Sequence, residues 1–324
     1  MSERTAEPLT GDGAGAAAAL AERVVGSLGS AVHASVETLR LPLLCLLAEG
    51  HVLVEDVPGV GKTVLAKALA RSLDLDFHRV QFTPDLLPAD VTGVNVFDRQ
   101  SGTFRFRPGP VFANIVLVDE INRASPKTQS ALLEAMQETQ VTVDGATHVL
   151  ERPFLVIATQ NPVEYEGTFP LPEAQLDRFA VRMTIGYPPH GEEARMLAEQ
   201  TTSPPLDHLR PVAGRAELLA AIGGARRVHV DDSVTSYVVS LLRHTRASGR
   251  LALGASPRSG ISLLSLSKAR ALVDGREFVL PEDVQALAGP VLAHRLLLAP
   301  DARATGVTPD EIVADAVSET PVPV

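Results

Sequence analysis

The chain has 324 residues, 45% of them hydrophobic, and a formal net charge of −10 at pH 7. This length is enough for at least one sizeable hydrophobic core and predicts a division into two domains. The acidic balance argues against non-specific binding to nucleic acid or to an anionic membrane as the main activity, and the single cysteine, Cys45, excludes a disulfide within the chain.

The N-terminal region is predicted to be a tail followed by two helices. Residues 1–15 are rich in Gly, Ala and acidic side chains, which indicates a disordered tail. Residues 16–47 are predicted to be helical, with breaks near Gly26–Gly29 and at Pro42. The apolar run Leu41–Ala48 is too short to span a bilayer, and the pattern of a signal peptide is absent. We therefore expect a cytoplasmic protein with no membrane insertion.

The sequence HVLVEDVPGVGKT at residues 51–63 predicts a buried strand that leads into a phosphate-binding loop. In such a loop, backbone N–H groups point toward the β- and γ-phosphates at the N-terminus of a helix. The Lys adds a positive charge, and the Thr hydroxyl is a Mg²⁺ ligand. The predicted nucleotide-binding residues are Val57, Pro58, Gly59, Val60, Gly61, Lys62, Thr63 and Val64.

One position departs from the pattern G-x-x-x-x-G-K-[ST], because Asp56 stands where glycine is usual. Aspartate is tolerated there if its φ is negative, but its carboxylate would repel phosphate if it pointed into the loop. Because the segment from Gly59 to Thr63 is intact, we expect the Asp56 side chain to point away.

Two predicted hairpins flank the next strand. The segments 94–97 and 103–107 alternate apolar and polar residues across a turn, and the segments 140–143 and 147–150 flank Asp144-Gly145, a strong two-residue turn signal.

Ile115–Val118 is a run of apolar residues typical of a central parallel strand, and Asp119 and Glu120 follow it. Carboxylates at this end of a strand lie where ligands bind in open α/β sheets. The first can hold Mg²⁺, and the second can orient or deprotonate an attacking water. From these residues alone, a solvated acidic turn is the competing interpretation.

The last two predicted strands carry polar residues at their ends. Phe154–Thr159 is followed by Asn161, whose amide could contact the γ-phosphate or a water, although Asn before Pro is also a common turn. Arg178 precedes the strand Val181–Ile185, and an Arg beside an Asp is more often a solvated ion pair than a functional group.

The order of predicted elements indicates two domains. Residues 16–187 hold five strands that alternate with helices, which predicts a parallel sheet with helices on both faces. From 188 to 324 helical patterns dominate, which predicts a small all-α lid. The predicted helices of the lid are Glu192–Gln200, Arg215–Gly223, Asp232–Ser248, Ser259–Asp274, Pro281–Leu298 and Pro309–Ala316.

Five segments in this order, DVPGVGKT, LVDEINRASPKTQSALLEAMQE, ATQNP, LPEAQLDRF and GASPRSG, resemble the MoxR family of AAA+ ATPases. The resemblance covers roughly residues 20–300, and its most specific parts are residues 119–138 and LPEAQLDRF. It implies an AAA+ P-loop domain with two hairpin inserts near a ring pore, followed by a helical lid. It also implies Mg²⁺-dependent hydrolysis of ATP by a chaperone-like factor that remodels or matures client proteins.

The resemblance implies a role for each polar residue of the loop and the strand ends. Lys62 would contact the phosphates, while Thr63 and Asp119 would hold Mg²⁺. Glu120 would be the base that activates water, and Asn161 would be the sensor-1 residue.

The resemblance also implies roles for three arginines. Arg178 matches the arginine finger, which enters the neighbouring subunit's site. Arg258 resembles sensor 2, which would report the γ-phosphate to the lid as lid and sheet enclose the nucleotide. Arg123 matches the family signature, and its action in cis, in trans or as a structural ion pair stays open.

The implied partners are further copies of the chain in a ring, with six as the expected number, and a separate protein with a von Willebrand factor A domain. A chelatase ATPase subunit would use the same catalytic residues. Two alternatives from other classes are a nucleotide-bound scaffold that does not hydrolyse ATP and a nucleic-acid motor that uses Arg105 and Arg107. The client protein is not indicated by the sequence.

Overall fold

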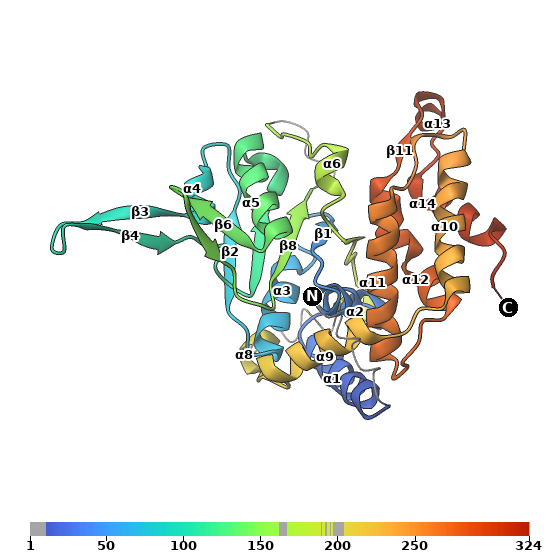
Figure 1. Ribbon diagram of the computed structural model, residues 1–324, viewed down its shortest axis with the longest axis horizontal. Helices are drawn as coiled ribbons and strands as arrows, with labels where there is room; N and C mark the ends of the chain where they lie inside the picture. Colours follow the sequence, from blue (N-terminus) through green and yellow to red (C-terminus); the bar gives the residue numbers. More distant parts are fainter. Residues whose placement is uncertain are drawn as a thin grey trace, which may run out of the picture.

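The computed structural model describes residues 11–161, 167–188, 190, 191, 193, 194, 196 and 204–323. The molecule consists of a five-stranded parallel sheet with helices on both faces and a group of helices beside one edge of that sheet (Figure 1). This arrangement confirms the predicted fold class, an α/β domain followed by a helical lid.

The central sheet has the strand order β2-β5-β8-β1-β9, and every neighbouring pair is parallel. We call the edge where the strands end the carboxyl edge, and the edge where they begin the amino edge. Strand β5 is buried along its whole length, as its apolar sequence predicted. The strands are β1 (Val52–Glu55), β2 (Phe77–Gln81), β5 (Ile115–Asp119), β8 (Leu155–Gln160) and β9 (Val181–Met183).

Two hydrophobic clusters, one on each face, hold the sheet between its helices. Ile115 and Leu117 of β5 belong to the cluster that includes helix α3 (Lys62–Ser72). Val116 and Val118 belong to the other cluster, which includes helix α5 (Pro126–Glu138). Successive strand residues point to opposite faces, so one apolar strand contributes to both clusters.

Both predicted hairpins are present. One is β3 (Gly93–Asp98) paired with β4 (Thr103–Pro108), and it projects far from the sheet (Figure 1). The other is β6 (Gln140–Val143) paired with β7 (Ala146–Val149), and its turn residues have the positive φ values, 49° and 82°, that an Asp-Gly turn adopts. The two hairpins are linked by a 2.8 Å hydrogen bond from Asn95 to Asp144.

The N-terminal helices correct two predictions. Helix α1 (Gly11–Gly29) includes residues 11–15, which the sequence analysis assigned to the tail; Ala14 is fully buried, and that packing extends the helix toward the N-terminus. Residues 1–10 lie outside the described residues. Helix α2 (Val36–Leu47) runs through Pro42 without a break. Buried side chains before and after Pro42 offset the backbone hydrogen bond that the proline removes.

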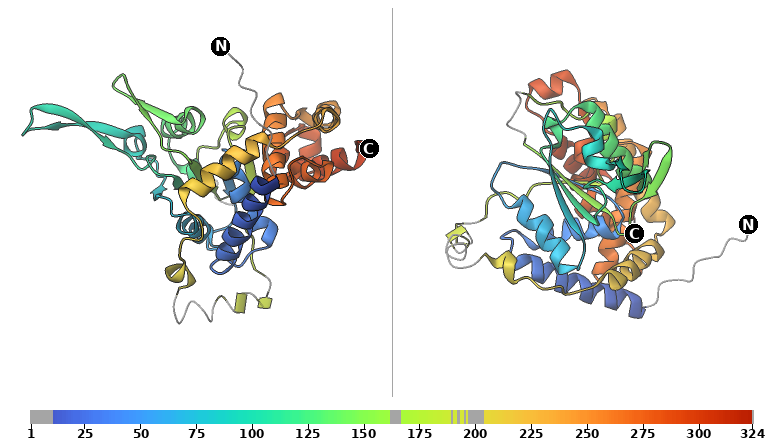
Figure 2. Two further views of the ribbon diagram at one scale, coloured as in Figure 1. Left: turned by 60° about the horizontal axis from the view of Figure 1, so that its bottom comes forward. Right: turned by 90° about the vertical axis from the view of Figure 1, so that its left-hand side faces the viewer.

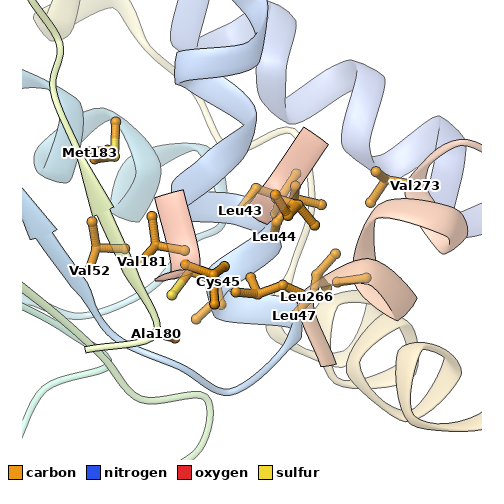
Figure 3. Close-up of a cluster of buried hydrophobic side chains, with 14 of the residues drawn as sticks. Leu43, Leu44, Cys45, Leu47, Val52, Ala180, Val181, Met183, Leu266 and Val273 are labelled. Atoms are coloured by element: carbon orange, nitrogen blue, oxygen red, sulfur yellow. The ribbon is translucent and has the colours of Figure 1, made fainter. Parts of the chain in front are cut away.

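Helix α2 connects the sheet to the lid. Figure 3 shows Cys45 and Leu47 of this helix among side chains of β1, β9 and helix α11 (Pro257–Val273), with Val181 and Leu266 on the two sides. Burial raises the pKa of the Cys45 thiol, so this cysteine acts as a small hydrophobic side chain. The lid therefore shares a continuous core with the edge strand β9.

The lid contains helices in the predicted order and one feature that the sequence did not predict. The helix expected over 281–298 ends at Leu292, and the chain continues into strand β11, which pairs antiparallel with β10. The helix expected over 192–200 lies largely outside the described residues. The lid elements are α9 (Arg215–Arg227), α10 (Asp232–Ala247), β10 (Leu251–Leu253), α11 (Pro257–Val273), α12 (Pro281–Leu292), η2 (Ala293–Arg295), β11 (Leu297–Leu298), α13 (Pro300–Ala304) and α14 (Pro309–Glu319).

Short helical segments complete the described part of the chain. They are α4 (Pro88–Thr92), η1 (Ile121–Arg123), α6 (Glu173–Leu176) and α8 (Pro205–His208). Figure 2 shows the two hairpins projecting on the side of the sheet opposite to the lid. Within the described ranges, no helix has both the length and the apolar character needed to cross a membrane.

Two buried histidines make stability depend on pH. His51 accepts a hydrogen bond from the Val156 N–H at Nδ1, so its Nε2–H donates to the Met136 carbonyl, each at 3.0 Å. Burial lowers the pKa of His51 to about 4 and that of His294 to about 3. The unfolded chain therefore binds these protons first as the pH falls below the ordinary value near 6.5.

We predict that the free energy of unfolding falls between pH 6.5 and pH 4, with each histidine contributing about 1.4 kcal/mol per pH unit to the slope. The substitution His51→Gln removes one of the two contributions. Urea unfolding at several pH values should show a shallower slope for the variant, and an unchanged slope would contradict the assignment.

Candidate active site

The loop after β1 forms a cradle at the N-terminus of α3. Gly59 and Gly61 adopt φ values of 88° and 95°, a region that glycine enters without steric cost. Gly61 is the N-cap of α3 and supplies no side chain, so the first amides of the helix are left for another acceptor. A helix N-terminus of this kind favours a phosphate group.

This cradle opens on a cavity of about 360 Å³ at the carboxyl edge of the sheet. The cavity collects polar residues from the loop after β1 and from the ends of β2, β5 and β8. Its lining is Pro58, Gly59, Gly61, Lys62, Thr63, Arg79, Gln81, Asp119, Glu120, Thr159 and Asn161. The structure thus gathers the predicted phosphate, Mg²⁺, base and sensor-1 residues around one space.

Asp56 points away from this cradle, as expected. Its carboxylate accepts hydrogen bonds from the N–H groups of Val57, Ile185 and Gly186 at 2.8, 2.7 and 2.8 Å. Its φ is not positive, so the site does not require the conformational freedom of glycine. Asp56 therefore anchors the start of the loop to the segment that follows β9.

Lys62 extends back along the loop, and its Nζ donates to the Asp56 carbonyl at 2.6 Å. Partial burial lowers the pKa of Lys62, while the charges of Asp56, Asp119 and Glu120 act in the opposite direction. A partly desolvated ammonium held in this position is suited to contact phosphate oxygens.

Asp119, at the end of β5, is held by two neighbours. Arg79 of β2 forms an ion pair with it at 2.6 Å, and the Thr159 hydroxyl donates to its other oxygen at 3.3 Å. Asp119 and Thr63 both offer oxygen ligands to the cavity, the type that Mg²⁺ prefers. Since Mg²⁺ keeps several waters, two protein ligands are sufficient.

Glu120 has a left-handed backbone conformation with φ of 56°, which is unusual for a residue other than glycine. The Thr159 hydroxyl accepts a hydrogen bond from the Glu120 N–H at 3.0 Å, and Arg123 pairs with the Glu120 carboxylate at 3.0 Å. The arrangement turns the carboxylate out of the strand direction into the cavity. Asn161 follows β8 and is almost fully buried beside it.

A second cavity, of about 340 Å³, lies on the other side of the same glycines. It is lined by Gly59, Val60, Gly61 and Val64 of the loop and by residues that precede α2 or follow β9, among them Val32, Tyr187 and Pro188. Of the eight predicted nucleotide-binding residues, only Val57 lines neither of these two cavities.

Arg178 and Arg258 lie together, but at the opposite edge of the sheet. Both line a third cavity of about 240 Å³ with Gly50 and His51, the two residues that precede β1. Strand β1 alone, with four residues, spans about 13 Å. The lid packs beside β9 and leaves Arg258 at the amino edge, so Arg258 does not line the phosphate cavity of its own chain, and its sensor-2 role stays a prediction.

Arg79, Gln81 and Thr159 belong to the site but were missed by the sequence analysis. Arg79 and Gln81 lie on β2, an edge strand whose mostly polar sequence, FHRVQ, hides its strand character. Thr159 is the last buried residue of β8, and its hydroxyl contacts both Asp119 and Glu120. Gln81 and Thr159 are among the last two residues of their strands, a position that points to the site, whereas Arg79 is the middle residue of β2 and carries no such signal.

Comparison with known families supports a nucleotide-binding fold. The model of the ATPase family associated with various cellular activities (AAA) matches residues 51–181, and the model of the AAA lid domain matches residues 243–316.

Several relatives match over most of the chain. The uncharacterized protein YeaC of Bacillus subtilis is 51% identical over 284 residues, which cover 88% of this chain and 89% of that protein. Chaperone MoxR1 of Mycobacterium tuberculosis is 39% identical over 324 residues, which cover 97% of this chain and 85% of that protein. Protein MoxR of Paracoccus denitrificans is 34% identical over 300 residues, which cover 85% of this chain and 87% of that protein. The crystal structure of a proposed ATPase from Cytophaga hutchinsonii superimposes with a TM-score of 0.90 and 35% sequence identity. The match covers 97% of this chain and 98% of that chain.

The anchoring role of Asp56 leads to a prediction for Asp56→Gly, which restores the usual loop pattern. The variant leaves the amides of Ile185 and Gly186 without their acceptor, so we expect a loss of about 1–3 kcal/mol in the free energy of unfolding and weaker nucleotide binding. Urea unfolding and titration with a fluorescent ATP analogue measure the two effects. Tighter binding by the variant would instead show that the Asp56 charge opposes phosphate.

Proposed function

The chain belongs to the MoxR family of AAA ATPases, and from this membership we propose that it hydrolyses ATP in a Mg²⁺-dependent reaction. We propose further that it does so in a ring of identical subunits and that the reaction drives the remodelling or maturation of client proteins. The observation that carries the proposal is the shared cavity at the carboxyl edge, which joins a glycine-rich helix N-terminus to Lys62, Asp119, Glu120 and Asn161.

Each residue of this cavity has a defined task in the proposed reaction. The first amides of α3 and the Lys62 ammonium bind the β- and γ-phosphates. Thr63 and Asp119 would hold Mg²⁺, which neutralises charge that develops on the phosphate oxygens. Glu120 takes the proton of the attacking water, and Asn161 orients that water or the γ-phosphate. Arg79 keeps the Asp119 carboxylate in place through its ion pair.

The second cavity is the proposed site of the adenine base. It adjoins the phosphate loop through Gly59 and Gly61, and Val32, Val64 and Tyr187 supply apolar and aromatic surface. Such surface suits a flat purine ring, whose faces are apolar and whose edges are polar.

The third cavity suggests how subunits cooperate. Arg178 is half-buried and Arg258 is exposed, so both guanidinium groups can be reached from outside the chain. Since neither lines the phosphate cavity of its own chain, we assign both to the active site of a neighbouring subunit. There they would stabilise the charge of the transition state, as arginine fingers do. A site completed in this way requires an assembly, for which family membership makes a hexameric ring the preferred size.

The proposed partners follow from family membership. They are a separate protein with a von Willebrand factor A domain and a client protein whose identity stays open. The chaperone name of the mycobacterial relative supports a remodelling role. The two exposed hairpins are the proposed pore-facing elements, because they project from the sheet on the side away from the lid.

The alternatives have less support. The alternative of a scaffold without hydrolysis was based on Asp56. The carboxylate of this residue is bonded to the segment that follows β9 and points away from the cradle. The alternative of a nucleic-acid motor was based on Arg105 and Arg107. Arg105 pairs instead with Asp98 of its own hairpin at 3.2 Å.

We predict that Lys62→Ala and Glu120→Gln separate binding from hydrolysis. Loss of the Lys62 charge should abolish binding of a fluorescent ATP analogue. Glu120→Gln should keep that binding and lower Mg²⁺-dependent phosphate release at least about a hundredfold, because an amide cannot accept the proton of the water. Near-normal turnover by Glu120→Gln would assign the base to another residue.

We predict that mixing variants reveals where the two arginines act. Arg178→Ala and Arg258→Ala should each be inactive alone, and each should recover part of its activity when mixed with Lys62→Ala, whose arginines serve a neighbour's intact site. Phosphate release by the mixed proteins is the measurement.

The mixture of Arg178→Ala with Arg258→Ala provides the decisive control. If both arginines enter the same neighbouring site, no subunit in this mixture receives both, and activity stays low. Recovery in this mixture would show that Arg258 acts within its own chain.

A further inference from the structure

A buried cation from the lid lies next to the segment that carries Arg178. Arg295 belongs to η2, after the last turn of α12, and only 6% of it is exposed. Burial lowers its pKa to about 10, with the Asp177 charge acting in the opposite direction, so the side chain remains a cation at neutral pH. A charge in such a place is costly unless it is paired and hydrogen-bonded.

The partners of Arg295 flank Arg178 on both sides. Its Nε forms an ion pair with Asp177 at 3.1 Å, and its Nη2 donates to the Phe179 carbonyl at 2.9 Å and, more weakly, to the Asp177 carbonyl at 3.4 Å. His294 donates from Nε2 to the same Phe179 carbonyl at 3.0 Å. The ring of Phe179 is itself fully buried. The residues before and after Arg178 are thus fixed, while Arg178 itself faces the cavity.

The same guanidinium also contacts the helix that carries Arg258. Its Nη2 donates to the Ser262 hydroxyl of α11 at 3.1 Å. Ser262 lies four residues after Arg258, and residues at this spacing share one face of a helix. Arg178, Arg258 and Ser262 accordingly line the same cavity.

We propose that Arg295 is a positioning residue that fixes Arg178 and Arg258 relative to each other, so that the two arginines enter a neighbour's active site as one unit. One guanidinium joins the 177–179 segment of the sheet domain to α11 of the lid. A change in lid orientation is therefore transmitted to both arginines together. The inference rests on the proposed function, in that it requires Arg178 to act in a neighbouring subunit.

The guanidinium of arginine suits this task. Its Nε lies at ion-pair distance from the Asp177 carboxylate while its Nη2 reaches two backbone carbonyls and a hydroxyl, whereas lysine offers a single ammonium that cannot occupy both positions. Arg295→Lys should therefore preserve the buried charge and lose part of the alignment. Displacement of a catalytic group by about 1 Å can cost about a hundredfold in rate.

The experiment compares Arg295→Met and Arg295→Lys with the wild-type chain. We expect Arg295→Met to bind a fluorescent ATP analogue with wild-type affinity and to lose about a hundredfold in phosphate release. We expect Arg295→Lys and Ser262→Ala, which are milder changes, to show smaller losses of the same kind. If Arg295→Met does not fold, these two variants carry the test.

Mixing then identifies the cause of the loss. An Arg295 variant should regain activity when mixed with Lys62→Ala, whose arginines are correctly placed. It should not regain activity when mixed with Arg178→Ala, because neither chain then supplies a correctly placed Arg178 to its neighbour. Failure to recover with Lys62→Ala, while Arg178→Ala does recover with it, would overturn the proposal. If neither the Arg295 variant nor Arg178→Ala recovers activity with Lys62→Ala, the neighbouring-subunit role of Arg178 is overturned instead.

The matched control is Arg276→Met. Arg276 is another lid arginine, bonded to Asp283 through two contacts of 2.7 Å, and it does not contact the 177–179 segment. This variant should lose thermal stability while its ATPase activity per folded subunit stays near that of the wild type. If Arg276→Met lost activity and behaved in mixtures as the Arg295 variants do, a general loosening of the lid would explain both results, and the positioning role would be refuted.

Discussion

The parallel direction of the five strands is the constraint on which the rest of the structure depends. It places the ends of β1, β5 and β8 at one edge, where the glycine-rich loop, Asp119 and Asn161 meet around one cavity. It equally places the starts of β1 and β9 at the other edge, beside Arg178 and Arg258. A single chain therefore carries both halves of the proposed catalytic machinery on opposite edges. In the proposed ring, a second copy of the chain joins them.

The position of the lid reinforces this separation. Helix α2 lies between β9 and α11, so the lid shares a hydrophobic core with the edge strand (Figure 3). Arg258 of α11 does not line the phosphate cavity. Arg182 of β9 adds a polar link, since it pairs with Glu55 of β1 at 3.1 Å and with Asp310 of the lid at 2.9 Å. Glu55 directly precedes the loop that Asp56 anchors. The lid is thus linked through Arg182 to the base of the phosphate loop and through Arg295 to the segment that carries Arg178.

Much of this could be predicted from the sequence, because the signals are local. The glycines of the loop, the apolar run of β5 and the Asp-Gly turn of the second hairpin each determine their own structure. What could not be predicted depends on packing between distant segments. Pro42 remains inside a helix because its neighbours are buried, and Arg258 faces away from its own phosphate loop because the lid lies beside β9. The roles of Arg79 and Arg295 likewise appear only when two strands, or the sheet and the lid, are placed side by side.

Each active site is proposed to be completed by a neighbouring subunit. The most direct test is Mg²⁺-dependent ATPase activity per subunit as the protein concentration is raised, with the oligomeric state measured in the same samples by analytical ultracentrifugation. The structure predicts that activity per subunit climbs steeply as monomers assemble and levels off when assembly is complete. Full activity per subunit in samples that contain only monomers would contradict it.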